Sequence, residues 1–460
     1  MSFVRELYDE AERKHKKALK EQGQNNVTVL PGNSDNSIGG FINAILADEK
    51  LAAMFRYNEM TGRVEIHGAW WQRFTIEMSD NDLNNIRLYI EQVYQMSHER
   101  NLPRAIDIVA HQDAYHPVRE ALEALNWDGK KRIENLLPRY LGAEKSEYTT
   151  EAMKIFMLGA IARVFTPGIK FDTMICIVED KQGGGKSTFA RFLAMQDEWF
   201  TDDIKNLEDD NVFRKLQGHW IVEFSEMLAT ANARTTEAIK AFLSRQKDTY
   251  KIPYDKFPHD FPRQCVFIGT TNDISFLPDD KTGNRRFLPI RINSDQAEAH
   301  PLEDEKETRL YILQAWAEAM EIYRGGEYSL TLPKEIQVTL PDIQREFVPE
   351  DPRVGIIQAW LDNCKYEAVC ITMLCAEIPE LGYSYQAPGQ KERNEIGKIL
   401  DKEIIGWERY KAASRQKRFP PPYGQQRAWC RVNAGDKKTG DFVQVESCQQ
   451  IKIPFEGGDG

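Results

Sequence analysis

Three consecutive glycines followed by Lys-Ser-Thr, at residues 183–188, constrain the fold more than any other feature of this sequence. They follow an apolar run at residues 174–178 and lead into a helical pattern over residues 187–193. A nucleoside triphosphate is bound by backbone N–H groups that converge at a helix N-terminus, and glycines let the phosphates approach the backbone closely. The pattern therefore predicts a strand, a phosphate-binding loop and a helix, in that order.

The loop residues have distinct expected roles. The Lys186 ammonium would contact the β- and γ-phosphates, and the Ser187 hydroxyl would hold Mg²⁺. The usual pattern also has an earlier glycine, but Asp180 occupies that position here, so we expect the turn out of the strand to be built differently. The alternative is a glycine-rich turn that precedes Lys-Ser by chance, which the strand, loop and helix order disfavours. The expected nucleotide-binding residues are Gly183, Gly184, Gly185, Lys186, Ser187 and Thr188.

The alternation of strand-like and helical segments between residues 174 and 292 predicts an α/β fold with a parallel sheet and crossover helices. A length of 460 residues indicates two to four domains. The expected strands are 174–178, 219–224, 264–270 and 286–292. The expected parts are a charged arm (1–35), a small α+β domain (36–116), a helical collar (117–166), a P-loop ATPase domain (167–348) and a basic C-terminal domain (349–460).

Composition excludes several classes of protein. No apolar run is long enough to span a bilayer and no basic-then-apolar leader is present, so we expect a soluble, cytosolic protein without membrane partners. The 7 cysteines include no C-x-x-C pair, which disfavours a zinc site and a disulfide framework. A formal net charge of −11 argues against coating nucleic acid with the whole surface, although a local basic groove stays compatible with it.

ATP hydrolysis also needs carboxylates at the end of a neighbouring strand. Glu226 lies just beyond the apolar run 219–224 and is best placed to polarise water, whereas Glu223 within the run would act on the metal. The next apolar run ends at Asn272, whose amide could sense the γ-phosphate. The alternative is that the two glutamates are surface residues and that Asn272 caps a turn, and without the other motifs we would favour these roles.

Paired arginines, Arg285 and Arg286, stand just before the last expected strand. An arginine that reaches a neighbouring subunit's nucleotide stabilises charge in phosphoryl transfer. The alternative is a surface ion pair, and the sequence does not say which arginine would act.

These motifs together resemble the virulence-associated protein E family, which is encoded by phages and mobile islands and is similar to superfamily 3 helicases. The resemblance covers roughly residues 36–345. It is carried by GGGKST, WIVEFSE, FIGTTN and GNRRF, with Tyr115-His116-Pro117, Trp127-Asp128-Gly129 and RVFTPGIKFD at 163–172.

The resemblance implies an AAA+ type ATPase that uses ATP and Mg²⁺, forms hexameric rings with sites shared between subunits, and translocates on single-stranded DNA. It places Lys186 and Ser187 in motif A, Asn272 in motif C and one of the paired arginines at the finger. Glu223 and Glu226 fall in motif B. Together with Ser187, these two glutamates would be the metal ligands. It also implies a pore hairpin within residues 247–256.

Within that hairpin Lys251 is the leading DNA contact, with Lys247 and Lys256 behind it, because lysines neutralise phosphate charge. A solvated lysine is the alternative for each.

A basic segment over residues 409–438 carries nine Lys/Arg against the single acid Asp436, with interleaved aromatic residues. Residues 353–445 are expected to form a winged-helix-like module in which Arg418 and Arg427 contact DNA. The alternative is a helical cap whose charges pair with the acidic rest of the chain.

We therefore expect a ring-forming, ATP-dependent DNA helicase that acts in replication of a phage or mobile element, in the cytosol of a bacterial host. Its partners would be single-stranded DNA and replication-fork or origin DNA. The alternatives are an ATP-switched initiator or helicase loader without unwinding activity, and an ATPase of phage packaging or antiphage defence.

Overall fold

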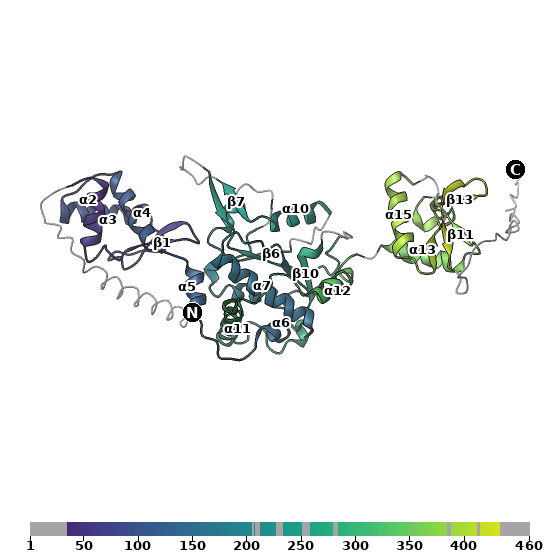
Figure 1. Cartoon of the computed structure of the whole chain (residues 1–460), viewed down its shortest axis with the longest axis horizontal. Helices are drawn as coiled ribbons and strands as arrows, with labels where there is room; N and C mark the ends of the chain where they lie inside the picture. Colours follow the sequence, from purple (N-terminus) through teal and green to yellow (C-terminus); the bar gives the residue numbers. More distant parts are fainter. Residues whose placement is uncertain are drawn as a thin grey trace, which may run out of the picture. The chain divides into compact units, whose positions relative to one another are not determined.

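The computed structural model describes most of the chain, which divides into two compact units, residues 1–349 and 350–460. Figure 1 shows their elements coloured along the sequence. The expected charged arm lies outside the described residues except for Asp35. The described residues are 35–204, 207, 212–226, 233–250, 258–278, 284–349, 351–383, 388–411 and 415–432.

Unit 1 begins with a small α+β region around a three-stranded sheet. Strand β1 pairs antiparallel with β2 and parallel with β3. The first helix ends at Ala47, earlier than its apolar pattern suggests, because the Asp48 carboxylate accepts the backbone N–H groups of Lys50 and Leu51 at 2.8 and 3.1 Å. The elements are α2 (Ile38–Ala47), β1 (Phe55–Asn58), β2 (Arg63–Ile66), α3 (Asp80–Tyr94), α4 (Asn101–Gln112) and β3 (Ala114–Tyr115).

A five-stranded sheet forms the centre of unit 1, and all of its neighbouring strands are parallel. The four strands predicted from the sequence are present, and β5, only two residues long, was missed. The spatial order is β10-β4-β9-β6-β5. The strands are β4 (Met174–Val178), β5 (Phe200–Thr201), β6 (Ile221–Ser225), β9 (Val266–Thr271) and β10 (Phe287–Arg291).

Helices cover both faces of this sheet, which is why its strands are almost continuously apolar. Ile175 and Ile177 of β4 pack on one face with the predicted helices before the phosphate loop, while Met174 and Cys176 pack on the other. The first face carries α5 (Pro117–Ala124), α6 (Ile133–Leu141), α7 (Glu147–Phe165), α8 (Lys186–Leu193) and α11 (Glu305–Gly325). The second carries α9 (Val212–Leu216) and α10 (Ala233–Leu243), and α12 (Lys334–Arg345) contacts β10.

A two-stranded hairpin follows α10. Strands β7 (Lys247–Tyr250) and β8 (His259–Pro262) are antiparallel and extend beyond the central sheet (Figure 1). Its base is fixed by a buried pair in which Arg263 Nε and Nη2 donate to the two Asp248 oxygens at 2.7 and 2.9 Å. The hairpin predicted from the sequence is therefore present, although its residues 251–257 lie outside the described part.

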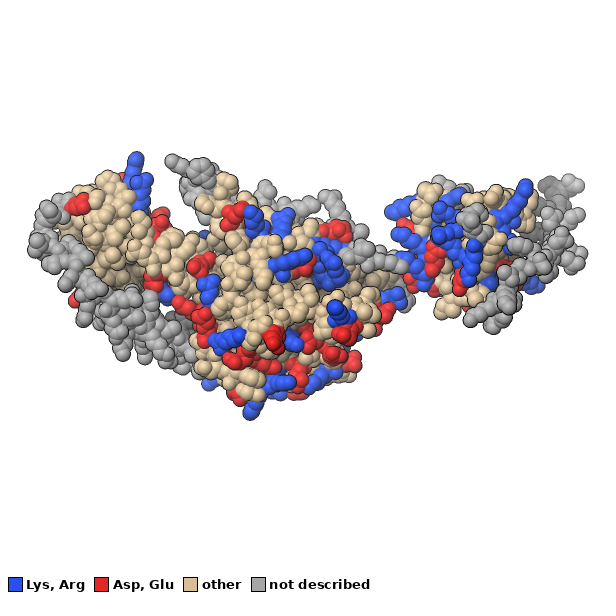
Figure 2. Space-filling view, in the orientation of Figure 1, with Lys and Arg blue, Asp and Glu red and all other residues tan. Residues whose placement is uncertain are grey.

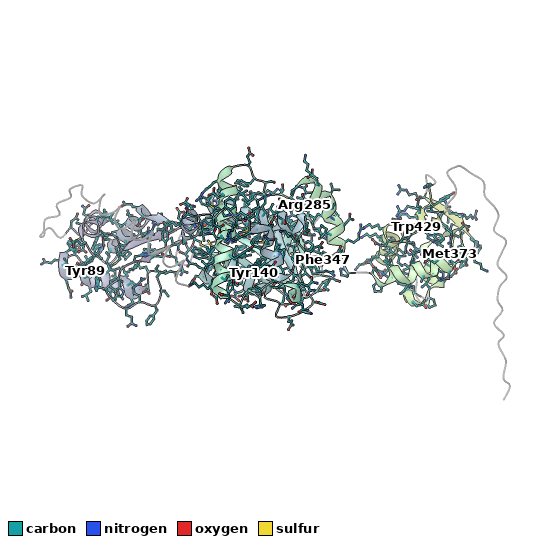
Figure 3. The ribbon with its side chains drawn as sticks, turned by 90° about the horizontal axis from the view of Figure 1, so that it is seen from below. Tyr89, Tyr140, Arg285, Phe347, Met373 and Trp429 are labelled. Atoms are coloured by element: carbon teal, nitrogen blue, oxygen red, sulfur yellow. The ribbon has the colours of Figure 1, made fainter. Side chains whose placement is uncertain are left out.

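In its described residues, unit 2 combines three α-helices with a three-stranded sheet, β11-β15-β12, and a separate hairpin of β13 and β14. Its core includes Ile357, Leu374, Ile396 and Trp429, the last of which Figure 3 labels. The elements are α13 (Pro352–Asn363), β11 (Ala368–Val369), α14 (Ile371–Glu377), α15 (Gln390–Lys402), β12 (Trp407–Arg409), β13 (Gln416–Phe419), β14 (Gly424–Arg427) and β15 (Trp429–Arg431).

No helix in the described ranges is long and apolar enough to cross a membrane.

Candidate nucleotide site

The central sheet brings three sequence motifs to one edge. Strand β9 lies between β4 and β6, and all three are parallel, so the segments that leave them emerge side by side. β4 leads into the phosphate loop, β9 leads to Asn272, and β6 carries Glu223 and leads to Glu226. Motifs that are far apart in the sequence therefore meet around one helix N-terminus.

The phosphate loop uses its glycines for two different reasons. Gly183 and Gly185 have φ of 84° and 82°, a region that other residues rarely adopt. At Gly184 a Cβ would lie 2.1 Å from Glu179 Oε2, so a side chain is excluded by close packing. Asp180 is not among the described residues with positive φ, which explains why the usual first glycine is not required there.

Helix α8 begins at Lys186, and no side chain caps its first turn. The backbone N–H groups of this turn are consequently available to an anion. Ser187 is exposed and Thr188 half-buried at the start of this helix.

The ammonium of Lys186 lies in a cage of oxygens. Its Nζ donates to the Lys181 carbonyl at 2.9 Å and to Asn272 Oδ1 at 2.8 Å, and lies 3.7 Å from Glu179 Oε2. Only 8% of the residue is exposed. Lys186 is thus held at the loop by groups of the protein itself.

Glu223 contacts the Ser187 hydroxyl, as motifs A and B would require. Ser187 Oγ donates to Glu223 Oε1 at 2.6 Å, and Thr270 Oγ1 donates to the same oxygen. Glu223 is fully buried, and burial raises the pKa of its carboxyl group, although both hydroxyl hydrogen bonds oppose this shift. Its Oε2 has no hydrogen-bond partner among the described residues.

These oxygens fit a Mg²⁺ ion. A buried carboxylate oxygen without a partner and an adjacent serine hydroxyl are hard ligands, and Mg²⁺ is commonly held by one or two protein oxygens with water and phosphate completing its shell. The described residues contain no cluster of three or more His, Cys, Asp or Glu suited to a metal, so an all-protein cage is not formed there.

Asn272 connects the phosphate loop to Glu226. Its Oδ1 accepts from Lys186, and its Nδ2 donates to Glu226 Oε1 at 2.6 Å. Glu226 is exposed and has φ of 46°, an uncommon value for a residue with a side chain, while its N–H donates to the Thr270 carbonyl at 3.1 Å. The backbone bend after β6 is thus tied to β9, next to Asn272.

The two arginines before β10 differ in their surroundings. Arg286 is half-buried, and its Nε lies 3.0 Å from Asp172 Oδ2. Arg285, which is labelled in Figure 3, is exposed and has no ion pair among the described residues. No contact between either arginine and the phosphate loop of the same chain is recorded in the described part.

The expected DNA contacts are only partly described. Lys247 on β7 is exposed and its Nζ lies 2.5 Å from Asp260 Oδ2 on β8. Lys251 and Lys256 lie outside the described residues. Arg418 and Arg427 are exposed on the β13–β14 hairpin of unit 2. Figure 2 shows many Lys and Arg side chains on the surface of this unit.

One residue of the site was missed by sequence reasoning. Glu179 ends β4's apolar run and is only 3% exposed. Its Oε1 accepts the Ser294 N–H at 2.7 Å, and its Oε2 faces Gly184 and Lys186 without a hydrogen-bond partner in the described chain. The signal was an acid directly after five buried apolar residues, a position where burial without a partner is costly.

Comparison with known proteins supports the sequence resemblance. Residues 122–348 match the model of the Virulence-associated protein E-like domain. No curated protein matches the chain. Two solved apo structures of the NrS-1 C-terminal region match it at 13% and 12% identity, with TM-scores of 0.38 and 0.43, covering 82% of this chain and 96% of theirs. The chain therefore contains a virulence-associated protein E-like domain, and the whole phosphate-loop site lies within it.

Proposed function

We propose that this chain is an ATP-dependent DNA helicase of superfamily 3 type, with an AAA+ type P-loop core, acting in replication of a phage or mobile genetic element. The observation that carries the proposal is the continuous contact Lys186–Asn272–Glu226. These residues come from three motifs and have the chemistry needed to bind a γ-phosphate, sense it and activate water.

ATP binding would exchange internal contacts for contacts with phosphate. Backbone N–H groups at Gly183 to Ser187 would hold the phosphates, and Lys186 would leave the Lys181 carbonyl and Asn272 for the β- and γ-phosphates. Asn272 would then bind the γ-phosphate, and the released Glu226 would accept a proton from the attacking water. Nucleotide binding and assembly of the hydrolytic site are thereby coupled through one amide.

Mg²⁺ would be held by Ser187 and Glu223, with Glu226 nearby, and would neutralise charge on the phosphates. The raised pKa of Glu223 follows from its burial, and a bound cation would favour its ionised form.

The ring and the DNA path complete the proposal. Arg285, exposed and without an ion pair in the described part, suits a finger that reaches the nucleotide of a neighbouring subunit, whereas Arg286 is engaged by Asp172. In a hexamer, the β7–β8 hairpin would carry Lys247, Lys251 and Lys256 to single-stranded DNA in the pore. The protein would work in the cytosol of a bacterial host.

The decisive experiment is Lys186→Ala, with Lys181→Ala as the matched control. The control removes an exposed lysine from the same loop but keeps the carbonyl that contacts Lys186. Lys186→Ala should lose ATPase activity and displacement of a strand from a forked substrate, while Lys181→Ala retains both. Unwinding by a folded Lys186→Ala protein would refute the mechanism.

An ATP-switched initiator or helicase loader is the second candidate, favoured by the exposed basic hairpin of unit 2. In that case the purified chain would hydrolyse ATP and bind duplex DNA but leave the forked substrate intact.

A further inference from the structure

The hairpin β13–β14 of unit 2 has two chemically different faces. Its register pairs Gln416 with Arg427, Lys417 with Gln426, Arg418 with Gln425, and Phe419 with Gly424. Successive side chains of a strand point to opposite faces and cross-strand partners share a face. One face therefore holds Lys417, Phe419 and Gln426, and the other holds Gln416, Arg418, Gln425 and Arg427.

The first face is fastened to the core of unit 2. Phe419 is only 7% exposed and packs in that core. Gln426 Oε1 accepts from Thr372 Oγ1 at 2.8 Å, and its Nε2 donates to the Tyr423 carbonyl at 2.7 Å. A slip of one residue would expose Phe419, so burial fixes the register and keeps the opposite face turned outward.

The outward face is a set of two arginines and two glutamines. All four residues, Gln416, Arg418, Gln425 and Arg427, are exposed. No acidic residue belongs to either strand of this hairpin.

Two other arginines of unit 2 are engaged by acids. Arg353 contacts Asp351 and Glu395, and Arg409 contacts Asp401. By contrast, no ion pair of Arg418 or Arg427 is recorded within residues 351–383, 388–411 and 415–432. Their charge is therefore available to an anionic partner.

We propose that this face reads base edges in the major groove of duplex DNA. The proposal deepens the function inferred above, in which DNA is the working partner. A two-stranded ribbon fits the major groove, where arginine pairs with guanine O6 and N7 and glutamine pairs with adenine N6 and N7, each through two hydrogen bonds. Glutamine also hydrogen-bonds to phosphate oxygens, but such contacts carry no sequence information, so a sequence preference distinguishes base readout from phosphate contact.

The arrangement fits duplex DNA better than duplex RNA, whose deep and narrow major groove excludes a ribbon. Arg418 and Gln425 are direct cross-strand partners, so they would address neighbouring bases. The predicted recognition sequence accordingly has G·C pairs opposite Arg418 and Arg427 and an A·T pair opposite Gln425.

The test uses the full chain with a library of randomised DNA duplexes, without nucleotide. A defined motif should be enriched. Arg418→Lys and Arg427→Lys should each reduce the preference for the selected duplex over a scrambled one by roughly tenfold, because a lysine keeps the charge but loses the paired hydrogen bonds. The slope of affinity against salt should stay the same, since the number of phosphate contacts does not change.

Gln425→Ala should relax the preference at one base position only. Arg345→Lys, an equally exposed arginine on α12 of unit 1, serves as the matched control and should leave the motif and the affinity unchanged. Thermal melting of each variant verifies that unit 2 is folded.

Enrichment of no motif, lysine variants with unaltered preference, or equal binding to duplex RNA of the selected sequence would each overturn the proposal. Lys186→Ala separates it from the proposed function, because that variant should select the same motif. If the unsubstituted chain selects a DNA motif but has no ATPase activity, the proposed helicase function is refuted and the proposed DNA recognition by the β13–β14 hairpin is supported.

Discussion

The phosphate loop in unit 1 and the β13–β14 hairpin in unit 2 both carry cations that we propose bind phosphate-bearing ligands, but the two sites hold these cations differently. Lys186 is 8% exposed and contacts Lys181, Asn272 and Glu179. Arg418 and Arg427 are exposed on the outer face of a hairpin. A ligand of the loop must replace contacts within the protein, whereas a ligand of the hairpin displaces only water and counterions.

This difference suits different tasks. In the proposed mechanism, phosphate binding would break the contacts of Lys186 with Asn272 and of Asn272 with Glu226, so the site would respond to its ligand. The exposed side chains of the β13–β14 hairpin would change their protein contacts little on binding. Because the strand register is fixed, they would present the same arrangement of hydrogen-bonding groups to every ligand. We therefore propose that the phosphate loop is a switching site and that the β13–β14 hairpin is a surface for sequence recognition.

Like the hairpin arginines, Arg285 of unit 1 is exposed and has no ion pair in the described part. Arg285→Ala should lower the ATPase rate of the assembled protein by about a thousandfold, the lower end of the effect of trans arginines. Arg286→Ala is the matched change and should mainly lower the melting temperature, since it removes the contact with Asp172.

Steady-state ATPase assays and melting curves distinguish the two arginines. Activity restored by mixing Arg285→Ala subunits with Lys186→Ala subunits would confirm action between subunits. A full ATPase rate in Arg285→Ala would exclude it as the finger.

Glu226 is the exposed member of the switching site. Glu226→Gln keeps an oxygen for Asn272 but removes the base, so kcat should fall by about a hundredfold while ATP still binds. Rapid-quench hydrolysis and binding of a fluorescent ATP analogue measure the two effects. Loss of binding with unchanged chemistry would show that Glu226 acts on the nucleotide instead.

Glu179 tests whether internal contacts oppose nucleotide binding. Glu179→Gln keeps an acceptor for the Ser294 N–H but removes the negative charge near Lys186, so the KM for ATP should fall by about tenfold, or roughly 1.4 kcal/mol. A purely structural role would instead raise KM and lower the melting temperature. Glu303→Gln, on the exposed segment before α11, should change neither.

Glu223 gives the smallest effect, on stability. Burial raises the pKa of its carboxyl, so the folded state binds a proton more tightly than the unfolded state. The contribution of this group to the free energy of unfolding should therefore decrease as pH rises from the unfolded pKa through the folded pKa.

Glu223→Gln should raise the melting temperature at pH 7 without Mg²⁺, and this gain should shrink as pH falls from the raised folded pKa towards 4.5, the ordinary value. Melting curves from pH 4 to pH 8 measure it. A variant that is less stable at every pH would show that the hydrogen bonds with Ser187 and Thr270 outweigh the buried charge.

The sequence predicted the central strands and the phosphate loop well because their signals are local. Five apolar residues before GGGKST need only neighbouring residues to be recognised, and the same holds for the apolar runs at residues 264–270 and 286–292. Short strands such as β5 escaped prediction, because two residues carry no periodicity.

The contacts of the site required the tertiary structure. Asn272 meets Lys186 and Glu226 only because β9 pairs between β4 and β6, an order that chain sequence does not imply. Glu179 acquires its place through Ser294, which is 115 residues away. Hydrogen bonds of this kind depend on strand order and on the burial of each side chain.

The residue types of both surfaces were thus determined by the sequence alone: glycines and a lysine at residues 183–186, and arginines and glutamines in residues 416–427. The tertiary structure decided which of them are already engaged and which face outward. The reason is that a side chain's partners depend on packing between distant segments, whereas its chemical groups are given by the residue type alone.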